Sequence, residues 1–291
     1  MEYFEKTIKL DKLHLYGLWD PHLGSLFCRV DEVIKIVDMI LKDPYGKCII
    51  GGDTGDYIVA GIKDRRFDVN ALSPEFKTFV ELERGIRRIF KPLADEGKIL
   101  HFHSGNHEEV LIRQFGDFMA AMCDDFGADY GLFSAITKLY MPKGSCKIYS
   151  AHGAGFTGSR SNDPDQRTSV LKRFLETKMQ RKAVADFYLM GHTHMLEGFP
   201  PVDDIENRHG PDGRWYAVNV PKKPFFGVCG SYLAPWDSKK WKDENGDTHG
   251  AVCYGEKKMY DPAPTGSLMV EIDECGKYIS HKKITFEPKD L

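Results

Sequence analysis

Short apolar runs that end in glycine or in acidic and imidazole side chains recur along the first two thirds of the chain. Their length and their boundaries predict buried strands. We expect five of these strands, at residues 13–19, 47–51, 98–103, 147–151 and 187–190. Between them apolar residues recur at helical spacing, and we expect helices at residues 30–42, 73–91, 110–126 and 169–183. Strands that alternate with helices predict an α/β protein.

The second expected helix has recognisable start and stop signals. Ser73-Pro74-Glu75 would place Ser73 at the N-cap, Pro74 at the first helical position and an acidic residue in the first turn. Pro92 has no backbone N–H to donate, so it should end or kink the helix.

The last hundred residues have a different pattern. We expect four more strands there, at residues 215–220, 225–233, 268–272 and 278–286. Two stretches, residues 196–212 and 235–264, are rich in Pro, Gly, Asp and Lys and have little periodicity, so we expect loop excursions. No repeat or linker divides the chain, and we expect a single domain over residues 1–291.

Composition narrows the class of protein. An apolar fraction of 42% is enough for a full core, and a net charge of −3 does not suggest a general nucleic-acid coat. We find no run of eighteen apolar residues and a charged start, so we expect neither a membrane span nor a secretory signal. The seven scattered cysteines form no C-x-x-C pair, which indicates reduced thiols in a cytoplasmic protein and argues against a cysteine-ligated metal.

Acidic and imidazole side chains lie where the first and fifth strands are expected to end. Asp20-Pro21-His22 follows the first strand, and Gly191-His192-Thr193-His194 follows the fifth. Residues i and i+2 of an extended segment point to the same side. Each pair can therefore face one cation.

The second strand runs into Gly51-Gly52-Asp53-Thr54-Gly55-Asp56, a glycine turn with two carboxylates. A carboxylate has two oxygens, so Asp53 at a strand tip can bridge two divalent cations placed roughly 3.5–4 Å apart. The third strand delivers Gly105-Asn106-His107-Glu108, and the fourth delivers His152-Gly153. Oxygen and imidazole donors without thiolates suit Mn, Fe, Zn, Ni or Co better than a structural zinc cage.

Other polar residues allow two interpretations each. His101 and His103 lie inside the third strand, where packing or a hydrogen bond to the backbone is a better explanation than metal ligation. Arg160 and Arg167 follow His152 in a polar segment and could hold a phosphate oxygen, or belong to an ordinary loop.

Aromatic and basic residues interleave in the second excursion. They could stack bases and bind phosphates, or form a solvated lysine-rich loop. These residues are Trp236, Lys239, Lys240, Trp241, Lys242, Lys257, Lys258 and Tyr260.

The five motifs, in this order and each after an apolar strand, resemble the calcineurin-like metallophosphoesterase family. The family pattern is D-x-H, G-D-x-x-D, G-N-H-(E/D), an isolated His followed by Gly, and G-H-x-H. The matching segments are Asp20-Pro21-His22, Gly52-Asp53-Thr54-Gly55-Asp56, Gly105-Asn106-His107-Glu108, His152-Gly153 and Gly191-His192-Thr193-His194. The resemblance spans residues 13–195.

The resemblance implies a four-layer αββα sandwich of two mixed β-sheets, with a two-metal site on loops at the strand ends. One metal ion would be held by Asp20, His22 and His194, the other by Asn106, His152 and His192, and both by Asp53. Manganese is the expected metal, and Fe, Zn, Ni, Co or Mg are alternatives.

The resemblance also implies roles for three further residues. His107 would face the substrate, and Asp56 would orient the His107 ring. Glu108 would support the ligands without binding a metal ion itself. The mechanism we expect is in-line attack on phosphorus by a hydroxide that bridges the two cations, with His107 as hydrogen-bond or proton donor.

Departures from the family pattern narrow the substrate. Ser/Thr protein phosphatases have Arg where this chain has Tyr57 and Ser104, so protein dephosphorylation is not expected. The run Tyr260 to Ser267 looks like the tail of small members similar to DNA-repair exonucleases. We therefore expect a phosphodiesterase or nuclease that acts on nucleotides or nucleic acid. A broad-specificity phosphomonoesterase and a non-catalytic metal-binding scaffold are the alternatives.

Overall fold

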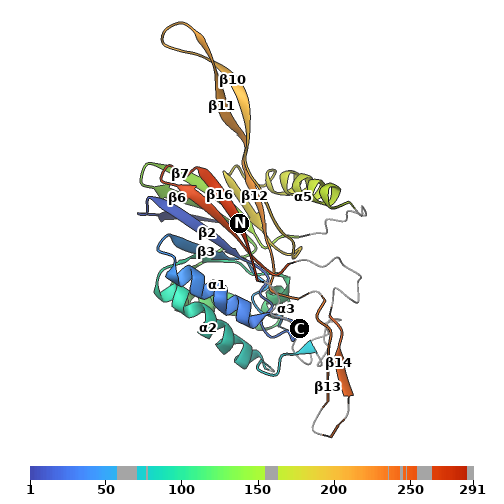
Figure 1. The fold of residues 1–291 in the computed structure, drawn as a ribbon. Coiled ribbons are helices and arrows are strands. Elements are labelled where there is room, and N and C mark those ends of the chain that lie inside the picture. Colours follow the sequence, from blue (N-terminus) through green and yellow to red (C-terminus); the bar gives the residue numbers. More distant parts are fainter. Residues whose placement is uncertain are drawn as a thin grey trace.

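Two six-stranded β-sheets form the centre of the protein (Figure 1). The computed structural model describes residues 1–57, 71–76, 78–154, 163–234, 236–242, 245–246, 248–253 and 264–286. Both sheets contain parallel and antiparallel neighbours, and a small number of helices cover them. The mixed α/β class predicted from the sequence is confirmed.

The first sheet carries three of the five motifs. Its strand order is β16 (Tyr278–Thr285), β15 (Gly266–Asp273), β2 (Lys12–Leu18), β3 (Gly46–Ile50), β4 (Ile99–Phe102) and β5 (Asp129–Tyr130). The strands β2, β3, β4 and β5 are parallel to one another. Their carboxyl ends therefore lie at one edge of the sheet, and the residues that follow β2, β3 and β4 gather there.

The second sheet carries the other two motifs. Its order is β1 (Glu2–Thr7), β6 (Ser134–Met141), β7 (Gly144–Ala151), β8 (Phe187–Met190), β12 (Phe225–Cys229) and β9 (Leu196–Phe199). The strands β7, β8 and β12 are parallel neighbours. His152 follows β7 and His192 follows β8, so this sheet also presents its motif residues at one edge.

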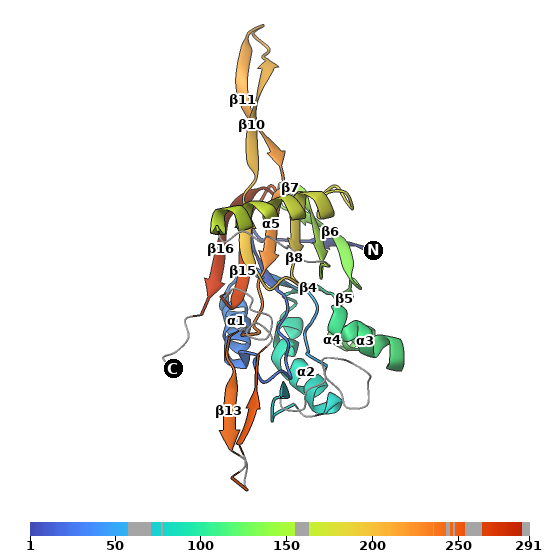
Figure 2. The same cartoon turned by 90° about the vertical axis from the view of Figure 1, so that its right-hand side faces the viewer.

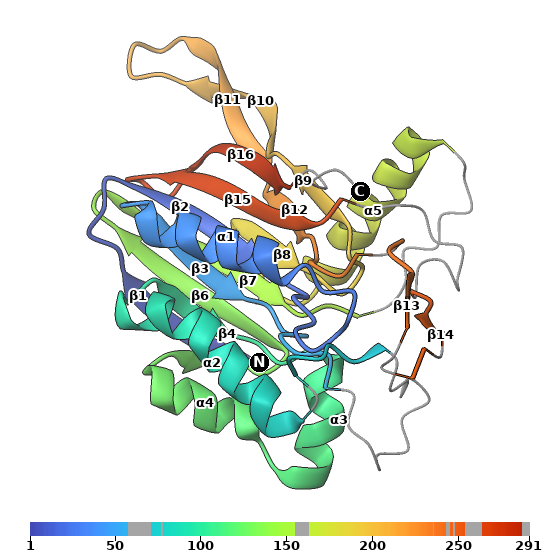
Figure 3. The same cartoon turned by 60° about the horizontal axis from the view of Figure 1, so that its bottom comes forward.

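Apolar side chains fill three separate layers of core. The layer between the two sheets contains Leu15 and Ile49 from the first sheet and Ile148, Leu189 and Phe225 from the second. A second layer packs α1 (Val30–Lys42), α2 (Phe79–Asp95) and α4 (Phe118–Phe126) on the outer face of the first sheet, as Figure 3 shows for α1 and α2. A third packs α5 (Pro164–Met179) on the second sheet, on the far side from α1 and α2 (Figure 2).

Two β-hairpins extend from the body in opposite directions (Figure 1). One pairs β10 (Val202–His209) with β11 (Trp215–Lys223), and the other pairs β13 (Lys239–Lys242) with β14 (Thr248–Ala251). The stretch 196–212, expected to be a loop excursion, thus contains β9 and β10. Residues 254–263 of the second excursion lie outside the described residues.

The predicted start and end of the second helix are wrong. The helix α2 begins at Phe79 with Thr78 as N-cap, and Pro92 lies inside a helix that continues to Asp95. Thr78 Oγ1 accepts the N–H of Glu81 at 3.2 Å, and the Glu81 carboxylate accepts the N–H of Thr78 at 2.9 Å. This reciprocal capping box satisfies two N–H groups, whereas Ser73 offered only one acceptor.

Three other boundaries differ from the sequence expectation. Residues 110–126 form two helices, because Gly116 with φ of 92° interrupts them and leaves α3 (Asn106–Phe115) separate from α4. The helix α5 starts at Pro164, after the N-cap Asp163. The run 225–233 is a strand only as far as Cys229, so Gly230 and Ser231 lie at a strand end.

The sequence interpretation missed several strands, among them β1, β5 and β6. Both β1 and β6 mix polar and apolar residues, so neither matched the short apolar runs on which the strand predictions rested. All seven cysteines are free thiols, and in the described part of the chain no helix has the length and apolarity to cross a bilayer.

The capping box predicts a stability difference between two similar substitutions. Thr78→Ala should lower the free energy of unfolding by about 1 kcal/mol, because it leaves the Glu81 N–H without its acceptor. Ser73→Ala, at the position the sequence favoured, should lower it by about 0.5 kcal/mol or less. Urea unfolding of both variants measures the difference, and a larger loss at Ser73 would show that the helix start is misplaced.

Candidate metal centre

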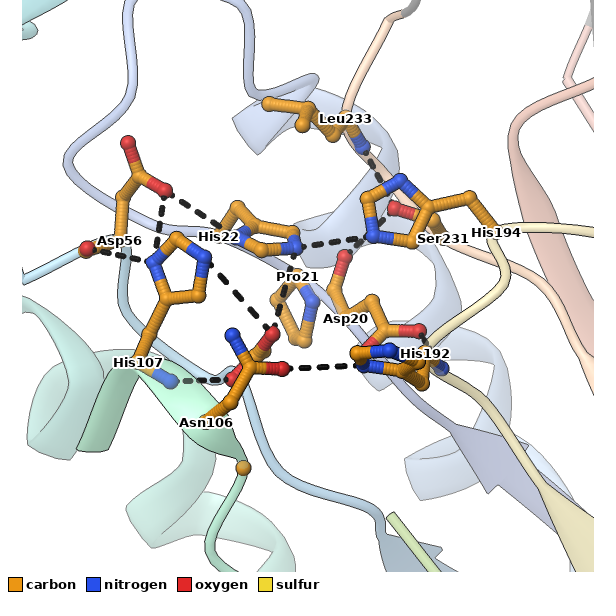
Figure 4. A network of polar contacts seen from close by, with 12 residues as sticks. Asp20, Pro21, His22, Asp56, Asn106, His107, His192, His194, Ser231 and Leu233 are labelled. Atoms are coloured by element: carbon orange, nitrogen blue, oxygen red, sulfur yellow. Dashed lines mark hydrogen bonds and ion pairs between the residues drawn. The ribbon is translucent and has the colours of Figure 1, made fainter. Parts of the chain in front are cut away.

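The carboxyl-terminal edges of both sheets meet, and the seven predicted metal ligands lie together there. Figure 4 labels five of them, Asp20, His22, Asn106, His192 and His194. They come from turns after β2, β3, β7 and β8 and from the first residue of α3, which follows β4. The seven are Asp20, His22, Asp53, Asn106, His152, His192 and His194. Residues far apart in the chain thus meet at one point, and His22 and His194, for example, are 172 positions apart.

One group of donors consists of Asp20, His22 and His194, whose ligand atoms all lie within 4.8 Å of one another. The Nε2 atoms of His22 and His194 are 3.1 Å apart. Two imidazole nitrogens that bind one cation at about 2.1 Å each must lie roughly 3 Å apart. The spacing of this pair is therefore compatible with a shared cation.

A second group consists of Asp53, His152 and His192, again within 4.8 Å. Asn106 belongs to it as well, because its Oδ1 lies 3.1 Å from His152 Nε2 and 2.9 Å from His192 Nδ1. An amide oxygen and two imidazole nitrogens point at one another here. They are the donor set that the sequence interpretation assigned to the second metal ion.

The Asp53 carboxylate lies between the two groups. Its Oδ2 is 3.8 Å from His22 Nε2 in the first group and 3.5 Å from His152 Nε2 in the second. Its Oδ1 accepts the backbone N–H of His107 at 2.8 Å, which fixes the orientation of the carboxylate. The position suits the bridging role, and that role itself stays a prediction.

Asp56 contacts two imidazoles at once (Figure 4). Its Oδ1 lies 3.1 Å from His107 Nδ1 and 3.2 Å from His22 Nδ1, and its backbone carbonyl oxygen lies 2.7 Å from His107 Nδ1. The sequence interpretation paired Asp56 with His107 but missed the contact with His22. A carboxylate on the far nitrogen of a ligating imidazole orients the ring, so Asp56 is placed to aim His22 as well.

Glu108 joins two of the strand-end turns. Its carboxylate accepts N–H groups from Gly105 at 2.8 Å, from Asp53 at 2.9 Å and from Thr54 at 2.7 Å. Burial and the nearby Asp53 carboxylate raise the pKa of Glu108 to about 7, whereas the N–H donors lower it. The side chain thus holds the turn after β3 against the start of α3.

Burial of the acidic groups dominates the electrostatics of the site. Burial, followed by the charge of Asp53, raises the pKa of Asp20 well above its ordinary value. Burial alone would also raise the pKa of Asp53, but the imidazoles of His152, His107 and His22 outweigh it and lower that pKa. Asp53 is therefore ionised in this environment.

The residues present fit a divalent cation. Asp20 Oδ1 is buried and has no hydrogen-bond partner among the described residues. The other oxygen of the same carboxylate accepts the N–H of His192 at 2.6 Å. A buried carboxylate oxygen without a donor is costly, and a cation held with His22 and His194 would remove that cost.

The backbone at the site adopts uncommon conformations. Non-glycine residues with positive φ are rare, and five of the predicted ligands belong to this class. They are Asp20 at 51°, His22 at 52°, Asp53 at 46°, His192 at 65° and His194 at 55°. Each such residue costs on the order of 1–3 kcal/mol, and strain of this kind concentrates at functional sites.

Two residues near the site were missed by the sequence interpretation. Ser231 Oγ donates to the carbonyl oxygen of Asp20 at 2.8 Å, and the Trp19 indole donates to the carbonyl oxygen of Ala151 at 3.0 Å. Gly230-Ser231 after an apolar run is the same signal that marked the other strand ends. The predicted strand includes this signal because it continues to residue 233, whereas β12 ends at Cys229.

The predicted substrate-binding residues remain largely untested. Arg160 lies outside the described residues, and Arg167 lies in the first half of α5. In the aromatic and basic stretch, Trp236 is exposed, whereas Lys239 donates to the carbonyl oxygen of Leu26 at 3.0 Å. Lys257, Lys258 and Tyr260 lie outside the described residues. The phosphate-binding role of these residues stays a prediction.

Comparison with known proteins adds little. No family model matches the chain, and no curated protein matches it. A solved structure from Streptococcus pneumoniae, titled a conserved uncharacterized protein and predicted phosphoesterase, aligns with 14% sequence identity over 95% of this chain and 99% of that one, at a TM-score of 0.32. A TM-score this low carries no argument about function.

The contacts of Glu108 predict a large effect from a small substitution. Glu108→Gln replaces one carboxylate oxygen with an amide donor that faces backbone N–H groups, so the free energy of unfolding should fall by about 2 kcal/mol. The matched control is Glu109→Gln next to it, which removes only the exposed ion pair with Arg113 and should cost about 0.5 kcal/mol or less. Urea unfolding of both variants compares them, and equal losses would contradict the assigned role.

Proposed function

We propose that this protein is a dinuclear-metal-dependent phosphodiesterase of the calcineurin-like metallophosphoesterase type, acting on nucleotides or nucleic acid. The observation that carries the proposal is the pair of donor groups that share the Asp53 carboxylate. The three layers of core are compatible with a four-layer αββα sandwich, which we propose as the architecture.

Asp20, His22 and His194 would hold one cation, Asn106, His152 and His192 the other, and Asp53 both. Two such ions, when bound, supply an activated water and neutralise charge on the phosphoryl oxygens. Mn is the metal we would test first, since this donor set accepts several borderline ions. The protein's own contribution is to fix these donors before substrate arrives.

His107 is the group we assign to the substrate. Its Nδ1 donates to the backbone carbonyl oxygen of Asp56 at 2.7 Å, and the Asp56 carboxylate lies 3.1 Å from the same nitrogen, so both groups orient the ring. Its Nε2 lies 3.9 Å from Asp53 Oδ2, so the ring points toward the shared carboxylate. His107 Nε2 is therefore placed to donate a hydrogen bond to a phosphoryl oxygen, or to donate a proton to the leaving oxygen.

The surroundings of two positions favour a diester over a phosphoprotein monoester. Tyr57, where protein phosphatases have Arg, is buried and packs against Phe118 with ring centroids 5.1 Å apart. Ser104, at the second such position, is buried and contacts the Tyr130 hydroxyl. Neither position supplies a guanidinium for the second negative charge of a monoester, whereas a diester carries only one charge.

Metal removal and replacement test the dinuclear proposal. Chelator-treated protein should lose hydrolysis and regain it with Mn²⁺, and equilibrium dialysis should find two cations per chain. Asp53→Asn should lower the affinity for both cations, and His194→Ala should lower the affinity for one of them. His209→Ala, on the projecting strand β10, is the control and should bind metal as the unaltered protein does. Protein that binds no cation would end the proposal.

The role of His107 predicts a change in turnover without a change in metal content. His107→Ala should lower kcat for bis-p-nitrophenyl phosphate by roughly 10²–10⁴-fold and leave bound Mn²⁺ unchanged. Unaltered turnover in this variant would remove His107 from the mechanism. In the parent protein, faster hydrolysis of p-nitrophenyl phosphate than of the diester would favour a phosphomonoesterase instead.

A further inference from the structure

A line of buried polar side chains crosses the core between the two sheets, close to the metal centre. Thr137 lies on β6, His101 on β4, Ser150 on β7 and His103 just after β4. All four are completely buried. Polar groups in such a position are retained only when each finds a partner, so their hydrogen bonds can be followed one by one.

The distances define a continuous chain of hydrogen bonds. Thr137 Oγ1 is 3.2 Å from His101 Nδ1, and His101 Nε2 is 2.8 Å from Ser150 Oγ. Ser150 Oγ is also 2.8 Å from His103 Nε2, and His103 Nδ1 is 3.1 Å from the carbonyl oxygen of Leu132. Every polar side-chain atom of the line takes part in the chain.

The carbonyl at one end sets the direction of the whole chain. The oxygen of Leu132 can only accept, so His103 Nδ1 carries the hydrogen and Nε2 of a neutral His103 must accept. Its donors are the Ser150 hydroxyl at 2.8 Å and His101 Nε2–H at 3.2 Å, and with either donor His101 carries its hydrogen on Nε2. Ser150 then accepts from His101 Nε2–H, and His101 Nδ1 accepts from the Thr137 hydroxyl. Burial lowers the pKa of His101 and lowers that of His103 to about 4, in agreement with two neutral rings.

These hydrogen bonds join two of the four strand ends that supply the second donor group, those that carry Asn106 and His152. Ser150 precedes His152 by two residues on the second sheet, and His103 precedes Asn106 by three residues on the first. The turn that contains Leu132 and Phe133 accepts two further hydrogen bonds. The carbonyl oxygen of Leu132 accepts the N–H of Ser104 at 2.8 Å, and the carbonyl oxygen of Phe133 accepts the N–H of His152 at 3.0 Å. Asn106 and His152 are thus connected through hydrogen bonds as well as through apolar packing.

We propose that His101, Ser150 and His103 are positioning residues that hold Asn106 and His152 at the separation required to bind one cation. Both rings are neutral, His101 with its hydrogen on Nε2 and His103 with its hydrogen on Nδ1. A directed hydrogen bond fixes distance and register between two sheets, whereas apolar contacts alone permit them to slide. This inference rests on the proposed dinuclear site and goes further by naming what sets its geometry.

The test removes one hydroxyl from the centre of the chain. Ser150→Ala should weaken binding of the second cation by up to about tenfold and leave binding of the first cation unchanged. The direct hydrogen-bond partners of metal ligands change affinity by about 10- to 100-fold, and Ser150 acts one residue further from the ligands. Mn²⁺ titration that resolves the two binding steps measures this difference. Ser145→Ala makes the same substitution at an exposed position of the same strand and should alter neither step. An equal loss of affinity for both cations, or no loss of affinity, would contradict the positioning role.

The ring tautomers provide a readout that does not depend on metal or on activity. Long-range proton–nitrogen NMR of the metal-free parent protein should show one neutral histidine of each tautomer at positions 101 and 103, and Ser150→Ala should change this pattern. Finding the same tautomer at both positions would contradict the proposed series of hydrogen bonds. If Ser150→Ala does not fold, Thr137→Val keeps the shape and removes the donor to His101, so the His101 signals and the second Mn²⁺ step should change. Parent protein that binds no metal but shows both tautomers would refute the dinuclear site alone.

Discussion

Two buried carboxylates, those of Asp20 and Asp53, lie where strands of both sheets end, and the surrounding residues are arranged around the cost of burying their charge. An ionised carboxylate taken out of water costs several kcal/mol unless it is paired or hydrogen-bonded. Around Asp53 the compensation comes from three imidazoles and a backbone N–H. Around Asp20 it is incomplete, because one oxygen lacks a donor. Bound cations would complete the compensation for both groups.

The two sheets make this concentration of charge possible. Parallel strands in each sheet end at the same edge, so short turns can present donors without a dedicated scaffold. Glu108 ties two of those turns together within the first sheet, and the chain through Ser150 ties the first sheet to the second. The left-handed backbone at five ligand positions is strain that these contacts hold in place.

The donor set and the substrate preference have separate origins. In the proposed function, the residues at the sheet edge would determine which cations bind and which bonds they help to break. Under the proposed function, recognition of a particular phosphoester would fall to segments around that edge, such as the turn that carries Leu132 and Phe133. The projecting hairpin of β10 and β11, with Trp215 exposed, supplies none of the seven donors. One set of donors can therefore serve several substrates in related architectures.

The amino-acid sequence by itself determined the identity of the donors and the strands that carry them. Apolar runs ending in glycine, carboxylates and imidazoles are local signals, and they located β2, β3, β4, β7 and β8 to within a few residues. Helix limits were less accurate where competing caps lay close together, as at Ser73 and Thr78, because the choice depends on contacts with the rest of the fold. Strands without a distinctive end, such as β6, gave no local signal.

Only the tertiary structure decided how these pieces meet. It showed Asp56 facing His22 as well as His107, Ser231 bonded to the backbone of Asp20, and Ser150 between two buried histidines. These contacts join residues that are tens to hundreds of positions apart, and no spacing in the sequence encodes them. The physical reason is that short-range patterns record burial and turns, whereas the distance between two strand ends is set by sheet order and packing.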